Sequence, residues 1–388
     1  MEREPLIIWR EVMPDVEKGV FGYISEHWGN KVLCYYIDNR LLERLDCGWD
    51  EHSYAKVCVE SIPSSTNPNL FVNNIISKYP KAIHVFFGGL RHTLRKYLDS
   101  YLDQSSDTKI VIIAEKPVIS GKLSKFKRIS KKVLYHQILH KYQTDIDAFL
   151  AMGQKGVVRY KEYGYSKESI YPFMYNPLIA DGDYKTQLDV VTINDPMKFL
   201  YLGRFDYQIK GCDNLMKAFD SLNPKLHGEW KLTLVGGYGK QKDEMIRWAN
   251  NRENVEFGGK WEQNEIVKNM SSYDICLVPS KEDGWNLTPN YAIYSHIGTI
   301  CSSEATSHEL IENSNSGIVY DYNDIEALKK SIEFAVENRD IVRKWKQSTY
   351  RYLDKISSKT VGNYFMDIID YTFYGTLNKP KCPWIIEL

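Results

Sequence analysis

The stretch KFLYLGRFDYQIKGCDNLMKAFDSL (198–222) contains the parts of one α/β unit in chain order. Its first residues form a short apolar run of strand length, and CDNLMKAFDSL (212–222) has the apolar spacing of a helix. The loop between them, GRFDYQIKG (203–211), has a glycine and a cation close to each end. A buried strand that runs through a short loop into a helix predicts a parallel sheet covered by helices on both faces.

This alternation recurs along the chain in two sets. The first set of expected strands is 6–9, 31–37, 56–60, 83–87, 109–115 and 149–153, and the second is 198–203, 231–237, 255–259, 275–280 and 299–303. Helices are expected at 212–222 and 324–339, and again in the aromatic stretch 341–375. The polar stretch 176–196 is interpreted as a linker. We therefore expect two doubly wound α/β domains that face each other across a cleft at the carboxyl ends of their strands.

Composition narrows the function classes. The chain has 388 residues, 43% of them apolar and 26% charged, which excludes a disordered protein. Lys+Arg and Asp+Glu number 50 each, so a general nucleic-acid binder is disfavoured. No apolar run approaches the ~20 residues of a membrane-spanning helix, and MEREPLIIW lacks the apolar core of a signal peptide. Seven cysteines without a CxxC pair favour a reduced, cytoplasmic protein.

Two loops at expected strand ends suit a phosphorylated ligand. In the loop 203–211, Arg204 and Lys210 stand beside the free N–H groups of a helix start, which favours a diphosphate site. The alternative is a surface loop with two solvated cations. The glycines of LVGGYGK (234–240) allow backbone to approach a ligand, but they are not in the GxGxxG register, and a plain tight turn explains them equally well.

A third loop lies in PSKEDGWNLTPNYAIYSHIGT (279–299). An acidic pair, Glu282 and Asp283, is followed by Gly284 and by a helix start near Thr288. Carboxylates beside helix N–H groups suit a ligand that carries both sugar hydroxyls and phosphate. An acidic surface turn is the alternative.

Taken in order, five motifs resemble the C-terminal half of the GT-B glycosyltransferases of family 4 (glycosyl transferases group 1). They are GRFDYQIKG, LVGGYGK, VEFGGKWEQNEI, YDICLVPSKEDGWNLTPNYA and the turn from Cys301 to Glu309, within about 195–340. The resemblance implies a GT-B fold of two facing Rossmann-like domains. It places an acceptor domain at 1–190, a nucleotide-sugar donor domain at 191–340, and a helical segment at 341–388 that crosses back onto the first domain.

The resemblance also implies roles for single residues. Arg204 and Lys210 would hold the donor diphosphate, and Asp283, or Glu282 one residue earlier, would contact the donor sugar. Glu115 falls where the family usually has a histidine near the transferred sugar, with His84 and His92 as weaker candidates. The remaining expected donor-site residues, among which Trp261 would stack on the base, are Gly203, Gly237, Lys260, Trp261, Gly284, Asn286, Leu287, Thr288 and Tyr291.

Tyr291 departs from the family pattern, because it stands where a second glutamate normally grips the ribose. A tyrosine hydroxyl cannot accept two hydroxyl groups as a carboxylate does. Either the ribose is held differently, or donor binding is weak or lost. The second case would make the chain a degenerate glycan-binding or partner subunit. Nucleotide-sugar epimerases and sugar phosphorylases share the architecture and remain alternatives.

The activity implied by the resemblance is sugar transfer with retention, from a nucleotide-sugar to a glycan or lipid-linked acceptor, in surface polysaccharide or glycolipid synthesis. A UDP-sugar is the first expectation for the donor and a GDP-sugar the second, with no cofactor and no metal. The weak metal-ligand spacings are Asp145–Asp147, Asp181–Asp183 and the pair His136 and His140.

The basic stretch KLSKFKRISKK (122–132) favours contact with a membrane surface. Leu123, Phe126 and Ile129 recur at spacing three among cations, as in an amphipathic helix that lies on anionic lipid. The expected membrane contacts are Lys125, Phe126, Lys127, Arg128 and Lys131, at the inner face of the membrane. The alternative is a solvated basic helix whose apolar stripe packs in the core.

Overall fold

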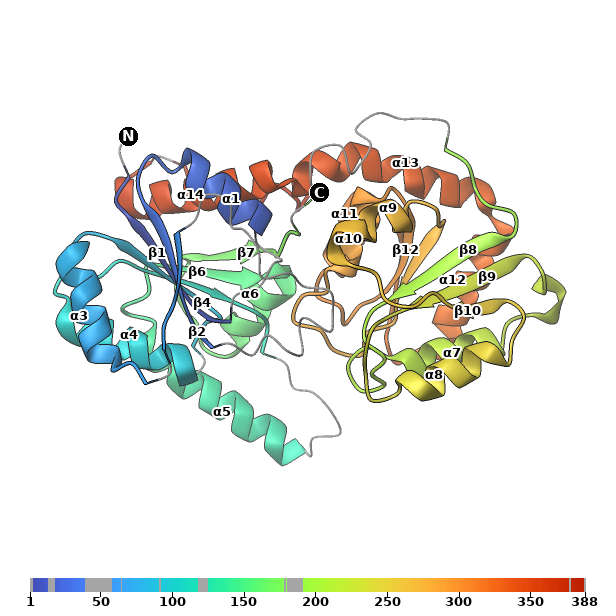
Figure 1. The fold of residues 1–388 in the computed structure, drawn as a ribbon, viewed down its shortest axis with the longest axis horizontal. Coiled ribbons are helices and arrows are strands. Elements are labelled where there is room, and N and C mark those ends of the chain that lie inside the picture. The colour runs from blue at the N-terminus through green and yellow to red at the C-terminus, as the bar shows by residue number, and fades with distance from the viewer. Residues whose placement is uncertain are drawn as a thin grey trace.

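The computed structural model describes residues 3–12, 18–38, 58–63, 65–90, 92–117, 125–177, 179, 191–376 and 378–386. These residues form two lobes, each built on one parallel sheet with helices on its faces (Figure 1). The expected α/β class is confirmed: the protein has two Rossmann-like domains, each with one parallel sheet.

The first lobe contains a seven-stranded sheet in the order β3-β2-β1-β4-β5-β6-β7. Its strands are β1 (Leu6–Val12), β2 (Val32–Asp38), β3 (Cys58–Ser61), β4 (Ile83–Phe87), β5 (Ile110–Ala114), β6 (Ala148–Met152) and β7 (Ile170–Phe173). Its helices are α1 (Lys18–His27), α3 (Pro68–Lys78), α4 (His92–Gln104), α5 (Lys125–Tyr142) and α6 (Gly153–Glu162). Strands β4, β5 and β6 are buried along their whole length, which explains their uninterrupted apolar sequences.

The second lobe contains a six-stranded sheet in the order β10-β9-β8-β11-β12-β13. Its strands are β8 (Met197–Leu202), β9 (Trp230–Val235), β10 (Val255–Phe257), β11 (Ile275–Val278), β12 (Gly298–Ser302) and β13 (Gly317–Tyr320). Its helices are α7 (Cys212–Asp220), α8 (Lys242–Asn250), α9 (Ile266–Met270), α10 (Thr288–Tyr294), α11 (His308–Ser314) and α12 (Ile325–Glu337), with 3₁₀ turns at Pro224–Leu226 and Gln263–Glu265.

Two C-terminal helices connect the lobes along one side of the molecule (Figure 1). Helix α13 (Arg339–Ile356) packs on α10 of the second lobe, and α14 (Ser358–Tyr374) packs on α1 of the first. Between them, Ser357 has extended backbone, and its hydroxyl accepts a hydrogen bond from the N–H of Thr360, which starts a new helix. An ion pair of 2.7 Å between Arg3 and Asp370 ties α14 to the N-terminal strand region.

The C-terminal tail bridges both lobes. Lys379 donates a hydrogen bond of 2.7 Å to the carbonyl of Glu168 in the first lobe. Further along, the Trp384 side chain is fully buried, and the Tyr352 hydroxyl donates to its carbonyl. The tail therefore fixes the orientation of the two lobes together with α14.

Two other findings concern redox state and membrane insertion. The described cysteines, which are all except Cys47, form no disulfide. No helix in the described part of the chain is long and apolar enough to cross a membrane.

Candidate functional site

The loops at the carboxyl ends of β8 and β11 are pressed together. Gly211 has φ 67°, and a Cβ there would lie 2.0 Å from the Pro279 carbonyl oxygen. The N–H of Lys281 donates to the Ile209 carbonyl at 2.8 Å. Gly203 directly follows β8, and its N–H donates to the Val235 carbonyl. Only glycine at position 211 allows this contact, so the loop 203–211 and the acidic loop after β11 form one surface.

Lys210 and Asp283 form an ion pair at the centre of this surface. Lys210 Nζ lies 2.5 Å from Asp283 Oδ2, and the side chains are 16% and 13% exposed. Half-buried Arg204 stands nearby, with its guanidinium carbon 5.9 Å from the centroid of the Tyr238 ring. Burial lowers the pKa of Arg204, but Tyr238 and Asp283 more than offset this, so the pKa is raised. The structure therefore brings together the two predicted cations and the predicted carboxylate.

The glycine-rich loop after β9 packs closely on the loop after β8. A Cβ at Gly236 would lie 2.3 Å from the Gly203 carbonyl oxygen, and one at Gly239, where φ is 141°, would lie 2.3 Å from the Phe205 carbonyl oxygen. The carbonyl of Gly237 accepts a hydrogen bond of 2.8 Å from Lys242 Nζ. Gly236 and Gly239 thus allow the backbones of the two loops to pack in direct contact.

The start of α10 is held by side chains within the protein. The Asn286 carboxamide oxygen accepts the Thr288 N–H at 3.0 Å, and the Thr288 hydroxyl donates to the Leu202 carbonyl at 3.3 Å. Asn286 and Thr288 are buried, and Leu287 between them is half-buried. Two hydroxyls from the turn after β12 support the same loop: Thr306 donates to the Asp283 carbonyl and Ser307 to the Asn286 carbonyl. Asn286 and Thr288 therefore fix the shape of the acidic loop.

Of the three residues expected near the nucleoside, Tyr291 lies on α10, and Lys260 and Trp261 lie in the loop after β10. Tyr291 is only 5% exposed, and its hydroxyl accepts a hydrogen bond of 3.3 Å from Gln263 Nε2. Lys260 is exposed and paired with Glu262 at 3.2 Å. Half-buried Trp261 packs on Tyr273, with ring centroids 6.0 Å apart.

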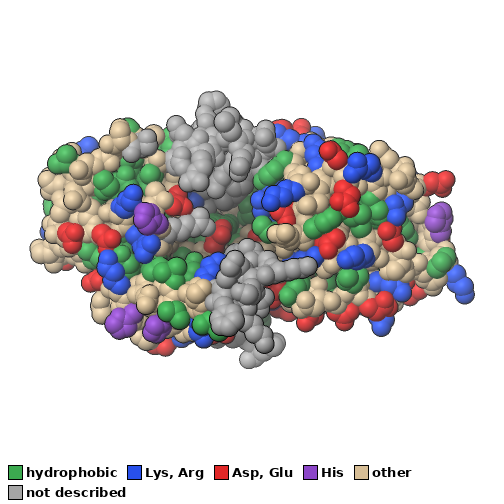
Figure 2. Space-filling view, turned by 90° about the horizontal axis from the view of Figure 1, so that it is seen from below, with side chains coloured by type: hydrophobic (Ala, Val, Ile, Leu, Met, Phe, Trp, Pro, Cys, Tyr) green, Lys and Arg blue, Asp and Glu red, His purple; other side chains and the backbone are tan. Residues whose placement is uncertain are grey.

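Glu115 from the first lobe reaches the acidic loop of the second. Its carboxylate accepts a hydrogen bond of 2.9 Å from the Tyr175 hydroxyl, and its carbonyl accepts one of 2.7 Å from the Tyr160 hydroxyl. A Cβ at Gly284 would lie 2.5 Å from Glu115 Oε2. In the space-filling view, acidic and basic side chains lie on both sides of the boundary between the lobes (Figure 2). Glu115 of the first lobe therefore lies against the acidic loop of the second lobe, which carries Asp283.

Lys116 and Lys155 belong to the same interface, and sequence reasoning missed both. Lys116 follows Glu115, its side chain is 1% exposed, and its Nζ lies 3.6 Å from a carboxylate oxygen of Glu304. Lys155 Nζ pairs with the same carboxylate at 2.6 Å. Burial lowers the pKa of Lys116, against the opposing effects of Glu304 and Glu282. The sequence offered one indication of Lys116: it directly follows Glu115, which was itself a predicted site residue.

Comparison with known proteins shows what the second lobe is similar to. Residues 184–352 match the family model of glycosyl transferases group 1. The second lobe is therefore similar to the domains of that family. A protein of 41.2 kDa from the cps region of Klebsiella pneumoniae is 23% identical over 205 residues. That match covers 50% of this chain and 55% of the Klebsiella protein, so the two correspond over about half their lengths.

Solved structures, a glycosyltransferase among them, share the whole two-lobed fold, which confirms the expected GT-B arrangement. The Anabaena protein Alr3699/HepE, solved in complex with UDP, superposes with a TM-score of 0.71 at 12% identity, over 95% of this chain and all of that one. WaaG, a glycosyltransferase involved in lipopolysaccharide biosynthesis, superposes with a TM-score of 0.62 at 16% identity, over 96% of this chain and all of that one. At these identities the likeness concerns the fold.

Glu309 connects the second lobe to the first lobe. Its Oε2 accepts a hydrogen bond of 2.7 Å from the N–H of Gln154, in the first turn of α6, and its Oε1 accepts one of 3.2 Å from Trp384 Nε1. Gly153, with φ 67°, leaves room for this carboxylate, because a Cβ there would lie 3.0 Å from Oε2. Burial raises the pKa of Glu309 to about 7, although both hydrogen bonds oppose the shift.

We expect Glu309 to give the protein a pH-dependent stability. Between the ordinary pKa of 4.5 and about 7, the folded protein binds a proton that the unfolded chain releases. The free energy of unfolding therefore falls as pH rises through this window, by on the order of 3 kcal/mol, and is flat above it. Glu309→Gln should remove most of this slope. Urea unfolding at pH about 5 and about 8 measures it.

The control is Glu326→Gln on α12, since the Glu326 side chain is 57% exposed and is not among the groups that shift the pKa of Glu309. This variant should keep the wild-type slope. An equal slope in Glu309→Gln and in the wild type would contradict the assignment.

The histidine and metal candidates lie apart from this surface. His84 is buried in the first lobe's core, where its ring stacks on Tyr101 and Trp9 Nε1 donates to its Nδ1; burial lowers its pKa to about 3. His92 is exposed at the start of α4. Within the described ranges, no group of three His, Cys, Asp or Glu side chains could hold a metal. Asp181 and Asp183 lie outside the described residues.

Proposed function

We propose that this chain is a retaining glycosyltransferase that moves a sugar from a nucleotide diphosphate, UDP before GDP, to a glycan or lipid-linked acceptor. The Lys210–Asp283 ion pair beside Arg204 carries the proposal, because it places diphosphate-binding and sugar-binding groups on one surface. Support comes from the HepE structure, which contains UDP. WaaG is involved in lipopolysaccharide biosynthesis and the Klebsiella protein belongs to a cps region, and both favour surface polysaccharide or glycolipid synthesis as the process.

In this mechanism Lys210 and Asp283 exchange partners when the donor binds. Lys210 turns from the carboxylate to the diphosphate, and Asp283 accepts hydrogen bonds from hydroxyls of the transferred sugar. As the bond to the sugar breaks, negative charge builds on the leaving diphosphate, and Arg204 and Lys210 stabilise it. These two cations supply the charge compensation, so the scheme needs no metal and no cofactor. The attacking hydroxyl enters on the face that the diphosphate leaves, which retains the anomeric configuration.

Glu115 and Tyr291 complete the proposed donor site. Glu115, fixed by Tyr175, faces the acidic loop and lies where a sugar on Asp283 would meet the first lobe. At the ribose, the Tyr291 hydroxyl and the amide of its partner Gln263 offer one polar group each, in place of a single carboxylate. This arrangement predicts a donor that binds through its phosphates more than through its ribose.

A transfer assay tests the proposal. Purified protein is incubated with UDP- and GDP-sugars and a panel of glycan and lipid-linked acceptors, and the anomeric proton of the product is read by NMR. The expected result is a product with the anomeric configuration of the donor. An inverted product would contradict retention, phosphate-dependent release of sugar phosphate would favour a phosphorylase, and conversion of the donor alone would favour an epimerase.

We also propose that α5 docks the enzyme on the inner face of an anionic membrane. Ile129, Val133 and Leu134 are exposed by 61%, 49% and 52%, so this part of the apolar stripe lies outside the core. Lys131 and Lys132 stand among them on the same helix, which suits anionic lipid. Leu123 and the side chains of Lys125, Phe126, Lys127 and Arg128 lie outside the described residues.

Replacing Ile129, Val133 and Leu134 by serine should lower binding to phosphatidylglycerol vesicles by about tenfold or more, since three apolar side chains lose their lipid contact. Co-sedimentation measures this. The control is Leu70→Ser on α3, whose side chain is 67% exposed. Equal binding by the triple variant and the wild type, or equal binding to neutral and anionic vesicles, would contradict the docking surface.

A further inference from the structure

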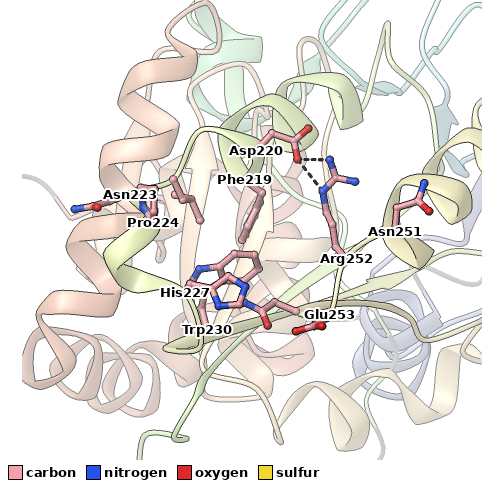
Figure 3. Close-up of a pocket in the computed structure, with 11 residues that line it drawn as sticks. Phe219, Asp220, Asn223, Pro224, His227, Trp230, Asn251, Arg252 and Glu253 are labelled. Carbon is pink, nitrogen blue, oxygen red and sulfur yellow. Dashed lines mark hydrogen bonds and ion pairs between the residues drawn. The ribbon is translucent and has the colours of Figure 1, made fainter.

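A pocket of about 450 Å³ opens on the second lobe, away from the donor loops (Figure 3). Its lining comes from the end of α7, the segment 222–227 around the turn Pro224–Leu226, the first residue of β9 and the residues 251–254 between α8 and β10. These segments lie at the amino ends of β9 and β10, whereas the donor loops follow their carboxyl ends. The six residues of β9 separate the two places by about 17 Å. The pocket is therefore distinct from the donor site.

One side of the pocket is aromatic. Trp230 and Phe219 pack together with ring centroids 4.9 Å apart, and both line the pocket. His227, whose side chain is exposed, lies beside Trp230 (Figure 3). Trp230 and Phe219 are only 8% and 5% exposed, so a ligand would meet the small accessible part of these rings together with the exposed imidazole, which offers a flat face for stacking.

The other side carries a rigid polar group. Arg252 Nη2 lies 2.6 Å from Asp220 Oδ1, and Arg252 Nε donates to the same oxygen at 2.8 Å. Trp248 Nε1 donates to Asp220 from behind at 3.1 Å. The carboxylate is thus held by two neighbouring side chains, with lone pairs left for a ligand, and Arg252 keeps N–H groups for one as well.

One buried side-chain amide in the lining lacks a hydrogen-bond partner among the described residues. The Nδ2 of Asn254, a lining residue, is buried and has no hydrogen-bond partner among the described residues. Buried polar groups in native proteins are almost always paired, because an unpaired one costs about 1–3 kcal/mol. Asn251 and Asn223, both exposed, add two more amides to the lining.

The charges and shape of the lining select among ligand classes. Asp220 and Glu253 outnumber Arg252, which disfavours a phosphate or another anion. The amides and the ion pair disfavour a lipid tail, since apolar atoms would leave them unpaired. A pyranose fits both sides, because one of its faces is apolar and its edges carry hydroxyls that both donate and accept. The volume lies within the range of small-molecule sites.

We propose that this pocket binds a neutral pyranose unit of a glycan chain, at a second site separate from the donor site. Binding here does not depend on the proposed transfer reaction. If the chain is a glycosyltransferase, the second site would hold a long acceptor on the enzyme and raise the effective concentration of its growing end. Polymeric acceptors would then have a lower KM than short ones, with the same kcat.

Fluorine NMR of protein labelled with 5-fluorotryptophan tests the pocket, because Trp230 lies in it and Trp261 lies in the proposed donor site. Spectra of Trp230→Phe and Trp261→Phe assign the two resonances. The protein is titrated with the methyl glycosides of glucose, galactose, mannose and N-acetylglucosamine at millimolar concentration, and separately with UDP. The expected result is a shift of the Trp230 resonance by at least one glycoside and not by UDP.

Two exposed lining residues provide variants that leave the core intact. His227→Ala and Asn251→Ala should weaken the glycoside titration by about tenfold each, the effect of one lost hydrogen bond or stacking contact. The control is Asn323→Ala, an exposed asparagine outside the lining. No shift of Trp230 with any glycoside, or shifts unchanged in both variants, would overturn the proposal. A glycoside shift at Trp230 with no UDP shift at Trp261 would keep the pocket and count against the proposed function.

Discussion

Replacing Lys210 by alanine is expected to lower the rate of sugar transfer by about a hundredfold to a thousandfold. Lys210 Nζ lies 2.5 Å from Asp283 Oδ2 on the proposed donor surface, and in the proposed mechanism it stabilises the charge on the leaving diphosphate. Loss of Lys210 also leaves the Asp283 carboxylate, only 13% exposed, without its cation partner, and this uncompensated negative charge would repel the donor diphosphate. Steady-state kinetics with a UDP-sugar measures the effect.

The control for this variant is Lys217→Ala. Lys217 lies on α7 of the same lobe, its side chain is 61% exposed, and its ion pair with Asp213 is 3.8 Å long. Transfer by this variant should match the wild type. A melting curve for each variant separates loss of the site from loss of the fold. Turnover by Lys210→Ala within a few-fold of the wild type would remove Lys210 from the mechanism.

Replacing Gly284 by alanine is expected to reduce transfer by about tenfold or more while nucleotide binding is kept. The new methyl group would lie 2.5 Å from Glu115 Oε2 and 3.1 Å from Glu115 Cβ, so the whole side chain of Glu115 must move. Tyr175 holds that side chain by a hydrogen bond of 2.9 Å. The clash therefore displaces the two lobes at the point where the sugar would lie, and small misplacements are costly for transfer.

Two further variants make this prediction specific. Gly22→Ala on α1 is the control, since a Cβ there meets nothing within 4 Å. The double variant Gly284→Ala with Glu115→Ala removes the clash and shows how much of the loss comes from steric contact and how much from the missing carboxylate. Normal transfer by Gly284→Ala would mean that the lobes separate here during the reaction, contrary to the account.

The fold followed from the sequence because most strands are uninterrupted apolar runs. Strands β4 and β5, for example, lie within one residue of the expected runs. Strand β13 (Gly317–Tyr320) was missed, because it has only four residues and three of them are half-buried. The expected helical stretch 341–375 is two helices, since the Ser357 cap interrupts it, a local signal that the apolar pattern did not show.

The site was less accessible to sequence reasoning, because most of its contacts join distant segments. Lys210 and Asp283 were placed together only by the family resemblance, since 73 residues separate them. The roles of Lys116 and Glu309 depend on how the lobes meet, and no local pattern reports that. Metal independence, retention and the identity of the nucleotide remain predictions.

The central claim is a donor site for a nucleotide diphosphate, and a thermal-shift titration with nucleotides tests it most directly. UDP, GDP and ADP are added to the wild type and to Lys210→Ala, with and without Mg²⁺. A nucleotide at about 100 times its Kd stabilises a protein by about 2.7 kcal/mol, which gives a measurable rise in Tm. The account predicts a rise with UDP, or with GDP, that does not depend on Mg²⁺ and is lost in Lys210→Ala. No rise with any of the three would contradict it and would favour a glycan-binding protein without a donor site.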